Sequence, residues 1–132
     1  MSTIKQLSDF DCALACTGMV LGKDPRDIFP IEYYEKVEEA RGTTMDDALT
    51  MAGLESKVDF DTVYTGSLVS GNVRLLLNWR KAVLQVPSLN NRKAFHFVYW
   101  DGQELHDPSN KQVYHWIDQC SPQHVVIFRN GL

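Results

Sequence analysis

The stretch of residues 6–22 constrains this chain more than any other, because it joins a polar loop to a helix that has no polar face. The loop runs up to Cys12, and nearly every residue after it is apolar or small. We expect the carboxylate of Asp9 or Asp11 to cap the first turn, whose amides lack partners within the helix. Glycine commonly ends a helix, so we expect this one to end at Gly22. The sequence therefore predicts a central, buried helix that begins at Cys12.

The position of Cys12 suits a nucleophile. The helix dipole and the free amides of the first turn both stabilise an anion there, and the thiolate is the reactive form of cysteine. Gln6 precedes Cys12 by six residues, so its side-chain amide is a candidate donor to an oxyanion that forms beside the sulfur. The competing interpretations are a structural cysteine and a solvated loop glutamine.

A predicted β-hairpin supplies a candidate base. Residues 94–100 alternate as a buried strand that carries His96 near its start, and an Asp-Gly turn follows. The returning strand, residues 103–107, ends at Asp107, so the hairpin brings this carboxylate alongside His96. His106 competes for the role of base, but adjacent residues of a strand face opposite sides. We therefore expect His96 to be the base and Asp107 to orient it.

These three side chains together predict nucleophilic catalysis. A thiolate attacks a carbonyl carbon, an imidazole later protonates the leaving amine, and a carboxylate orients the imidazole. A zinc site that combines Cys12, Cys16 and a histidine is an alternative. Structural zinc needs four ligands, however, and no second close ligand pair is present. We expect no metal and no cofactor, and we expect Cys16 to be a small buried residue.

The motifs as a set resemble the bacteriocin-processing, double-glycine leader peptidases, which are papain-like cysteine peptidases. The resemblance rests on Gln6 and Cys12, the Asp before this cysteine, the second cysteine four residues later, the His-Phe-Val sequence and the downstream Asp-Pro. It covers most of the chain, including Gly42-Thr43-Thr44 at the start of a helix. The family usually has Gly directly after the nucleophile, where this chain has Ala13.

The resemblance implies a single papain-like peptidase domain over residues 1–132, with Cys12, His96, Asp107 and Gln6 as catalytic residues. It also implies cleavage of a peptide or protein substrate after a double glycine. The chain has no Gly-Gly dipeptide, so self-processing at such a site is not expected. Two other functions stay open: a papain-like module that binds a peptide without cutting it, and a thiol deamidase or acyl transferase that acts on a protein.

Composition limits the partners and the compartment. The length of 132 residues fits one domain with a moderate core. The net charge is −4 with scattered acidic residues, so we expect no nucleic-acid partner. No apolar run approaches a membrane-spanning length. Relatives of the resembled family are commonly fused to a transporter, so we expect this chain to act alone or by association with a transporter or host protein. Three cysteines and no secretion signal predict a reducing, cytoplasmic location.

The remaining chain predicts an α+β fold. Helices are expected first, at residues 31–41 with an inward stripe of Ile31, Tyr34, Val37 and Ala40, and at residues 44–54 with Met45, Leu49 and Ala52 buried. Further elements are a strand at 57–60, a helix at 69–79, a strand at 82–86, a short helix or turn at 113–120, and a strand at 123–128. We expect an N-terminal helical layer packed on a mostly antiparallel sheet, with the active site in the cleft between them.

Overall fold

The computed structural model describes residues 3–66, 77–87, 95–109, 112–114 and 124–128. Helices come first along the chain: α1 (Cys12–Leu21), α2 (Pro25–Ile28), α3 (Ile31–Ala40) and α4 (Met45–Ser56). The strands follow: β1 (Thr62–Gly66), β2 (Ala82–Pro87), β3 (Phe95–Trp100), β4 (Leu105–Asp107), β5 (Gln112–Tyr114) and β6 (His124–Phe128). The fold is α+β, as the sequence predicts. Within the described ranges, no helix combines the length and the apolar character that crossing a membrane requires.

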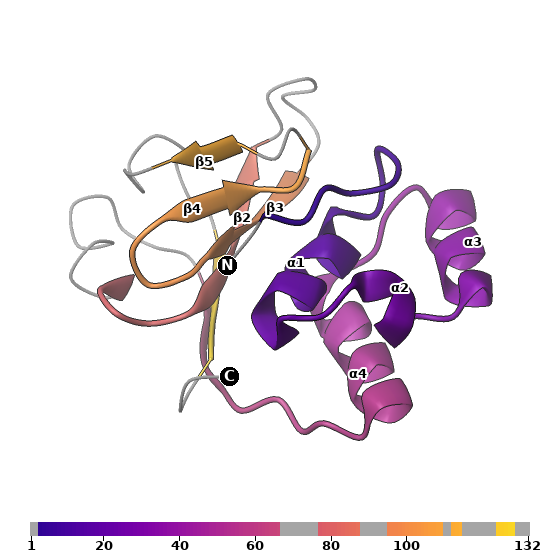
Figure 1. Cartoon of the computed structure of the whole chain (residues 1–132), viewed down its shortest axis with the longest axis horizontal. Coiled ribbons are helices and arrows are strands. Elements are labelled where there is room, and N and C mark those ends of the chain that lie inside the picture. Colours follow the sequence, from indigo (N-terminus) through magenta and orange to yellow (C-terminus); the bar gives the residue numbers. More distant parts are fainter. Residues whose placement is uncertain (1–2, 67–76, 88–94, 110–111, 115–123, 129–132) are drawn as a thin grey trace.

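The strands form one six-stranded sheet in the order β1-β6-β2-β3-β4-β5. Every neighbouring pair is antiparallel, and β2 pairs with β3 from Ala82 opposite Trp100 to Pro87 opposite Phe95. The helices all lie to one side of the sheet, with α1 closest to it (Figure 1). The predicted helical layer on a mostly antiparallel sheet is therefore confirmed.

Helix α1 is the centre of the core. All of its residues from Cys12 to Val20 are buried. One apolar cluster joins this helix to α3 and α4 and to three sheet residues, Val83, Tyr99 and Phe128. The helix ends at Gly22, which adopts a left-handed conformation with φ of 68° and carries no side chain that would oppose it. The prediction of a buried helix between Cys12 and Gly22 is confirmed.

The predicted cap of α1 is wrong. Asp11 directly precedes the helix, but its side chain accepts no hydrogen bond from the first-turn amides. Its carboxylate points back along the chain and accepts hydrogen bonds from the backbone amides of Leu7 and Ser8, at 2.8 Å each. Asp9 is exposed. The loop before the helix competes for the carboxylate of Asp11 and captures it.

The inward face of α3 also differs from the prediction. Tyr33 and Val37 are its buried residues, whereas Ile31 is 70% exposed. The ring of Tyr33 stacks on that of Phe29, with centroids 5.3 Å apart. Packing of this aromatic pair sets the rotation of the helix about its axis. The spacing of apolar residues had predicted Tyr34 on the inward face, one residue away from Tyr33.

Helix α4 runs further than predicted. Thr44 caps its start by accepting a hydrogen bond from the amide of Asp47 at 3.1 Å, and the predicted buried edge is confirmed. The helix continues to Ser56 and ends at Lys57, whose φ of 57° is left-handed. The prediction of a strand at residues 57–60 is therefore wrong, and the strand forms at β1 instead.

The later strands agree closely with the sequence. The predicted strands at 82–86, 94–100 and 123–128 correspond to β2, β3 and β6. Residues 112–114 form strand β5. The helix or turn predicted for residues 113–120 is therefore wrong for residues 113 and 114. The rest of that segment, most of the helix predicted at 69–79, and Cys120 lie outside the described residues.

Candidate active site

The β3–β4 hairpin places His96 beside Asp107. His106 pairs with Tyr99 across the two strands, so the next residue, Asp107, lies on the opposite face. Because His96 is three residues from Tyr99, it lies on that same face as Asp107. The imidazole Nε2 and the carboxylate Oδ1 are 2.8 Å apart. Both side chains are largely buried, at 15% exposed for His96 and 7% for Asp107.

Three donors converge on one oxygen of Asp107. Oδ1 accepts the bond from His96, and it also accepts bonds from the amide of Ser109 at 2.9 Å and the hydroxyl of Ser109 at 2.7 Å. Burial opposes the charged carboxylate, but these hydrogen bonds outweigh it and hold the pKa of Asp107 below its usual value. Ser109 was not among the predicted site residues. Its signal is the Asp-Pro-Ser spacing, which is typical of a turn closed by an aspartate side chain.

Cys12 is a second neighbour that affects the imidazole of His96. Burial lowers the pKa of His96, but hydrogen bonds to Asp107 and then to Cys12, with the charges of both partners, raise it to about 9. Asp107 occupies Nε2, which leaves Nδ1 as the nitrogen available to the thiol. The structure thus brings together Cys12, His96 and Asp107 from α1, β3 and β4, and it favours a charged imidazole between two acidic groups.

The two cysteines of α1 differ in access. Cys12, at the first position of the helix, keeps 9% of its surface exposed, whereas Cys16 one turn later has none. Burial, followed by the charges of Cys12 and Asp107, raises the pKa of Cys16 well above its usual value. Cys16 is therefore a neutral, enclosed thiol, and Cys12 is the more exposed of the two.

Gln6 is held beside this group by its backbone. Its amide donates a 2.8 Å hydrogen bond to the carbonyl of Pro108, the residue after Asp107. Its side-chain Nε2 donates to the carbonyl of Ser8 at 2.7 Å. A primary amide carries two N–H groups, so one remains for a further acceptor. The N-terminal segment that carries Gln6 runs from the sheet to the start of α1 (Figure 1).

His106, the competing histidine, belongs to a separate buried network. Its Nε2 lies 2.7 Å from Asp101 Oδ2, and its Nδ1 lies 2.7 Å from the hydroxyl of Thr3. His106 is only 2% exposed, so no substrate reaches it. Because both of its ring nitrogens are engaged, His106 serves to fasten the N-terminal segment to the hairpin. No signal in the sequence pointed to Thr3 or Asp101.

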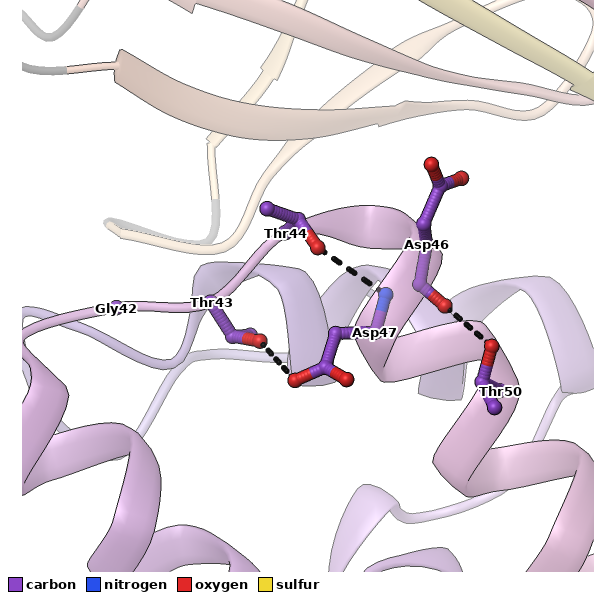
Figure 2. Close-up of a pocket in the computed structure, with 6 residues that line it drawn as sticks. All are labelled: Gly42, Thr43, Thr44, Asp46, Asp47 and Thr50. Atoms are coloured by element: carbon purple, nitrogen blue, oxygen red, sulfur yellow. Dashed lines mark hydrogen bonds between the residues drawn. The ribbon is translucent and has the colours of Figure 1, made fainter.

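A shallow, open pocket of about 470 Å³ lies at the start of α4. Figure 2 shows its lining, in which Thr43 bonds the side chain of Asp47, Thr44 bonds the amide of Asp47, and Thr50 bonds the carbonyl of Asp46. These bonds complete the first turns of the helix. None of the four predicted catalytic residues lines this pocket, and the predicted cleft between helices and sheet stays a prediction.

Neither a metal-binding cluster among the described residues nor a curated protein of similar sequence accompanies this site. Within residues 3–66 and the later described segments, no group of three or more His, Cys, Asp or Glu side chains is arranged to hold a metal ion. No protein-family model matches the chain, and no curated protein matches it in sequence. The geometry and the sequence motifs therefore carry the functional conclusion.

Proposed function

We propose that this protein is a papain-like cysteine peptidase that cleaves a peptide or protein by a Cys-His-Asp mechanism. The observation that carries the proposal is the row Cys12, His96, Asp107. Cys12 lies partly accessible at a helix start. Burial lowers the pKa of the His96 imidazole, but Asp107 and Cys12 raise it, and its Nε2 lies 2.8 Å from the buried carboxylate. Such a row is the arrangement that nucleophilic catalysis at a carbonyl requires.

The mechanism follows from the charges. The raised pKa of His96 keeps its imidazole protonated at neutral pH, and a neighbouring positive charge stabilises the thiolate form of a cysteine. The sulfur of Cys12 attacks the scissile carbonyl, and the carbonyl oxygen becomes an oxyanion to which the free N–H of Gln6 donates. His96 gives its proton to the leaving amine, which leaves an acyl-enzyme, and then activates the water that releases the acid. Asp107 holds the imidazole in orientation through both steps.

The substrate class comes from the resemblance. The double-glycine leader peptidases cut after two small residues, and a buried nucleophile with 9% exposure is compatible with a narrow approach of that kind. Ala13, which follows the nucleophile in place of the family's glycine, adds one methyl group beside it. We accordingly expect a substrate with small residues at the cleavage site, in the cytoplasm, either free or presented by a transporter or host protein.

The test is incubation of the protein with a peptide library that contains members with and without Gly-Gly, followed by mass spectrometry. Fragments that the Cys12→Ala variant does not produce are the expected result, with Gly-Gly peptides cut first. Intact peptides in which water has converted a side-chain amide to a carboxylate with release of ammonia would instead assign a deamidase, and intact peptides that have gained an acyl group would assign a transferase. Peptides that are retained but never altered would contradict catalysis and assign a binding module.

A further inference from the structure

The carboxylate of Asp11 is turned away from the helix that it precedes. Asp11 is 2% exposed, and its two oxygens accept three hydrogen bonds from two consecutive residues of the loop. Oδ2 accepts from the amide of Leu7 at 2.8 Å, and Oδ1 accepts from the amide of Ser8 at 2.8 Å and from its hydroxyl at 3.2 Å. A buried carboxylate with this many donors fixes the loop backbone firmly, because bonds to an ionised acceptor are the stronger ones.

The same loop carries Gln6. Ser8, whose backbone amide donates to Asp11, also presents the backbone carbonyl to which Gln6 Nε2 donates, at 2.7 Å. The hydroxyl of Ser8 in turn accepts from the amide of Phe10 at 3.2 Å. The side chain of Gln6 is thereby connected to Asp11 through one residue, and Asp11 is bonded covalently to Cys12. This chain of contacts joins the amide of Gln6 to the residue that precedes Cys12.

We propose that Asp11 is a positioning residue, which holds the oxyanion donor Gln6 in register with Cys12. This inference rests on the proposed function. An oxyanion donor is effective only when it is aimed at the place where charge develops, and misplacement by about 1 Å costs about a hundredfold in rate. A carboxylate accepts from both loop amides, whereas an asparagine amide would accept with one atom and oppose a donor with the other.

Two reactions of Cys12 separate this role from general support of the fold. In acylation by p-nitrophenyl acetate, the sulfur bonds to the acetyl carbon, an oxyanion forms, the C–O bond breaks and p-nitrophenolate leaves. In alkylation by iodoacetamide, the sulfur displaces iodide at a saturated carbon, and no oxyanion forms. The ratio of the two rates therefore reports the oxyanion donor without requiring a peptide substrate.

We expect the ratio of acylation to alkylation to fall about a hundredfold in Gln6→Ala and about tenfold or more in Asp11→Asn. The double variant should show no greater fall than Gln6→Ala alone, because Asp11 acts through Gln6. Asp9→Asn is the matched control, since it removes the same charge from the exposed position two residues earlier, and its ratio should stay at the wild-type value. Ser8→Ala, which keeps the buried charge, should give a small fall of about threefold.

Several outcomes would overturn the role of Asp11. These are an unchanged ratio in Asp11→Asn, a parallel loss of both rates in Asp11→Asn and Ser8→Ala, and losses that multiply in the double variant. If Asp11→Asn does not fold, Ser8→Ala decides alone, and an unchanged ratio there contradicts the proposal. If the ratios behave as expected but no peptide is cut, the peptidase function fails while the positioning role of Asp11 stands.

Discussion

At the scale of single residues, hydrogen bonding fixes the position of the Asp107 carboxylate. Its Oδ1 accepts one hydrogen bond from His96 and two from Ser109. The two bonds from Ser109 fix the carboxylate independently of the imidazole. An imidazole oriented by such a group keeps Nδ1 directed to one place. The contrast between Cys12, at 9% exposed, and Cys16, at none, predicts which sulfur reacts.

Substitution of the two cysteines should have different effects. Cys12→Ala should abolish turnover and the iodoacetamide labelling of residue 12, measured by peptide mapping, while the fold persists, because one partly exposed sulfur is lost. Cys16→Ala should keep both activities and lower the free energy of unfolding by about 1 kcal/mol, the cost of a small cavity. Turnover assays and urea unfolding of both variants measure this, and an inactive, folded Cys16→Ala beside an active Cys12→Ala would reverse the assignment.

The raised pKa of His96 predicts a dependence of stability on pH. A group whose pKa is higher in the folded state stabilises fully below its unfolded value, 6.5, and that stabilisation disappears as pH rises through about 9. Asp107→Asn removes a partner that raises this pKa. The wild type should therefore exceed Asp107→Asn in free energy of unfolding by on the order of 2–3 kcal/mol near pH 6, and the difference should shrink by pH 10. Urea unfolding across that range, with NMR titration of the imidazole, measures both quantities. A difference that grew with pH would contradict the ion pair.

At the scale of elements, the N-terminal segment fastens the hairpin to α1. Thr3 bonds His106 although 103 residues separate them along the chain, and the amide of Gln6 bonds the carbonyl of Pro108. Between these two contacts lies Asp107. The segment therefore holds the strand that carries the carboxylate next to the loop that leads to Cys12.

Thr3→Val tests this fastening, because it removes the hydroxyl and keeps the shape. The buried Nδ1 of His106 would lose its partner, so the free energy of unfolding should fall by about 1–3 kcal/mol. In the folded range, alkylation and turnover should stay close to wild type, since His106 does not touch the reacting atoms. Loss of turnover without loss of stability would show that His106 takes part in the chemistry.

The junction of α1 and α2 gives a second prediction at this scale. A methyl group on Gly18 would lie 2.8 Å from the carbonyl of Lys23 and 2.8 Å from Pro25 Cδ. Alanine favours a helix over glycine by about 1 kcal/mol, but overpacking costs about 1–3 kcal/mol. Gly18→Ala should therefore be destabilised in urea unfolding, and a stabilised variant would show that the α1–α2 turn moves freely.

At the scale of the whole molecule, the helical layer and the sheet share one core. Side chains of α1, α3 and α4 pack in the same cluster as Val83, Tyr99 and Phe128 of the sheet. Neither layer can therefore bury its apolar face alone. The predicted single domain should unfold in one transition.

Two probes test this cooperativity. Tryptophan fluorescence reports the surroundings of the three tryptophans, which include the buried Trp100 of β3, and far-UV circular dichroism reports mainly the helices. Their urea midpoints should coincide. Separate midpoints would mean that the helical layer and the sheet are independent folding units. Phe128→Ala, at the contact between the layers, should shift both midpoints together and lower the free energy of unfolding by about 3–5 kcal/mol.

The sequence by itself determined the features that depend on near neighbours. The start of α1 at Cys12 follows from the change from a polar loop to an apolar run, and its end follows from Gly22. The strand that carries His96 follows from alternation and a tight turn. Each of these signals acts within a few residues, so no distant contact was needed to predict them. Cys12, His96 and Asp107 could be proposed as one site because each lies in or beside an element that such local signals predict.

Only the tertiary structure decided which partner each polar group takes. The sequence assigned Asp11 to the helix amides, whereas the loop captured it, and nothing local paired His106 with Asp101 and Thr3. The rotation of α3 followed from the stacking of Tyr33 on Phe29. A hydrogen-bonding group or an apolar face binds whichever complement the fold brings closest, and that choice depends on contacts between segments far apart in the chain.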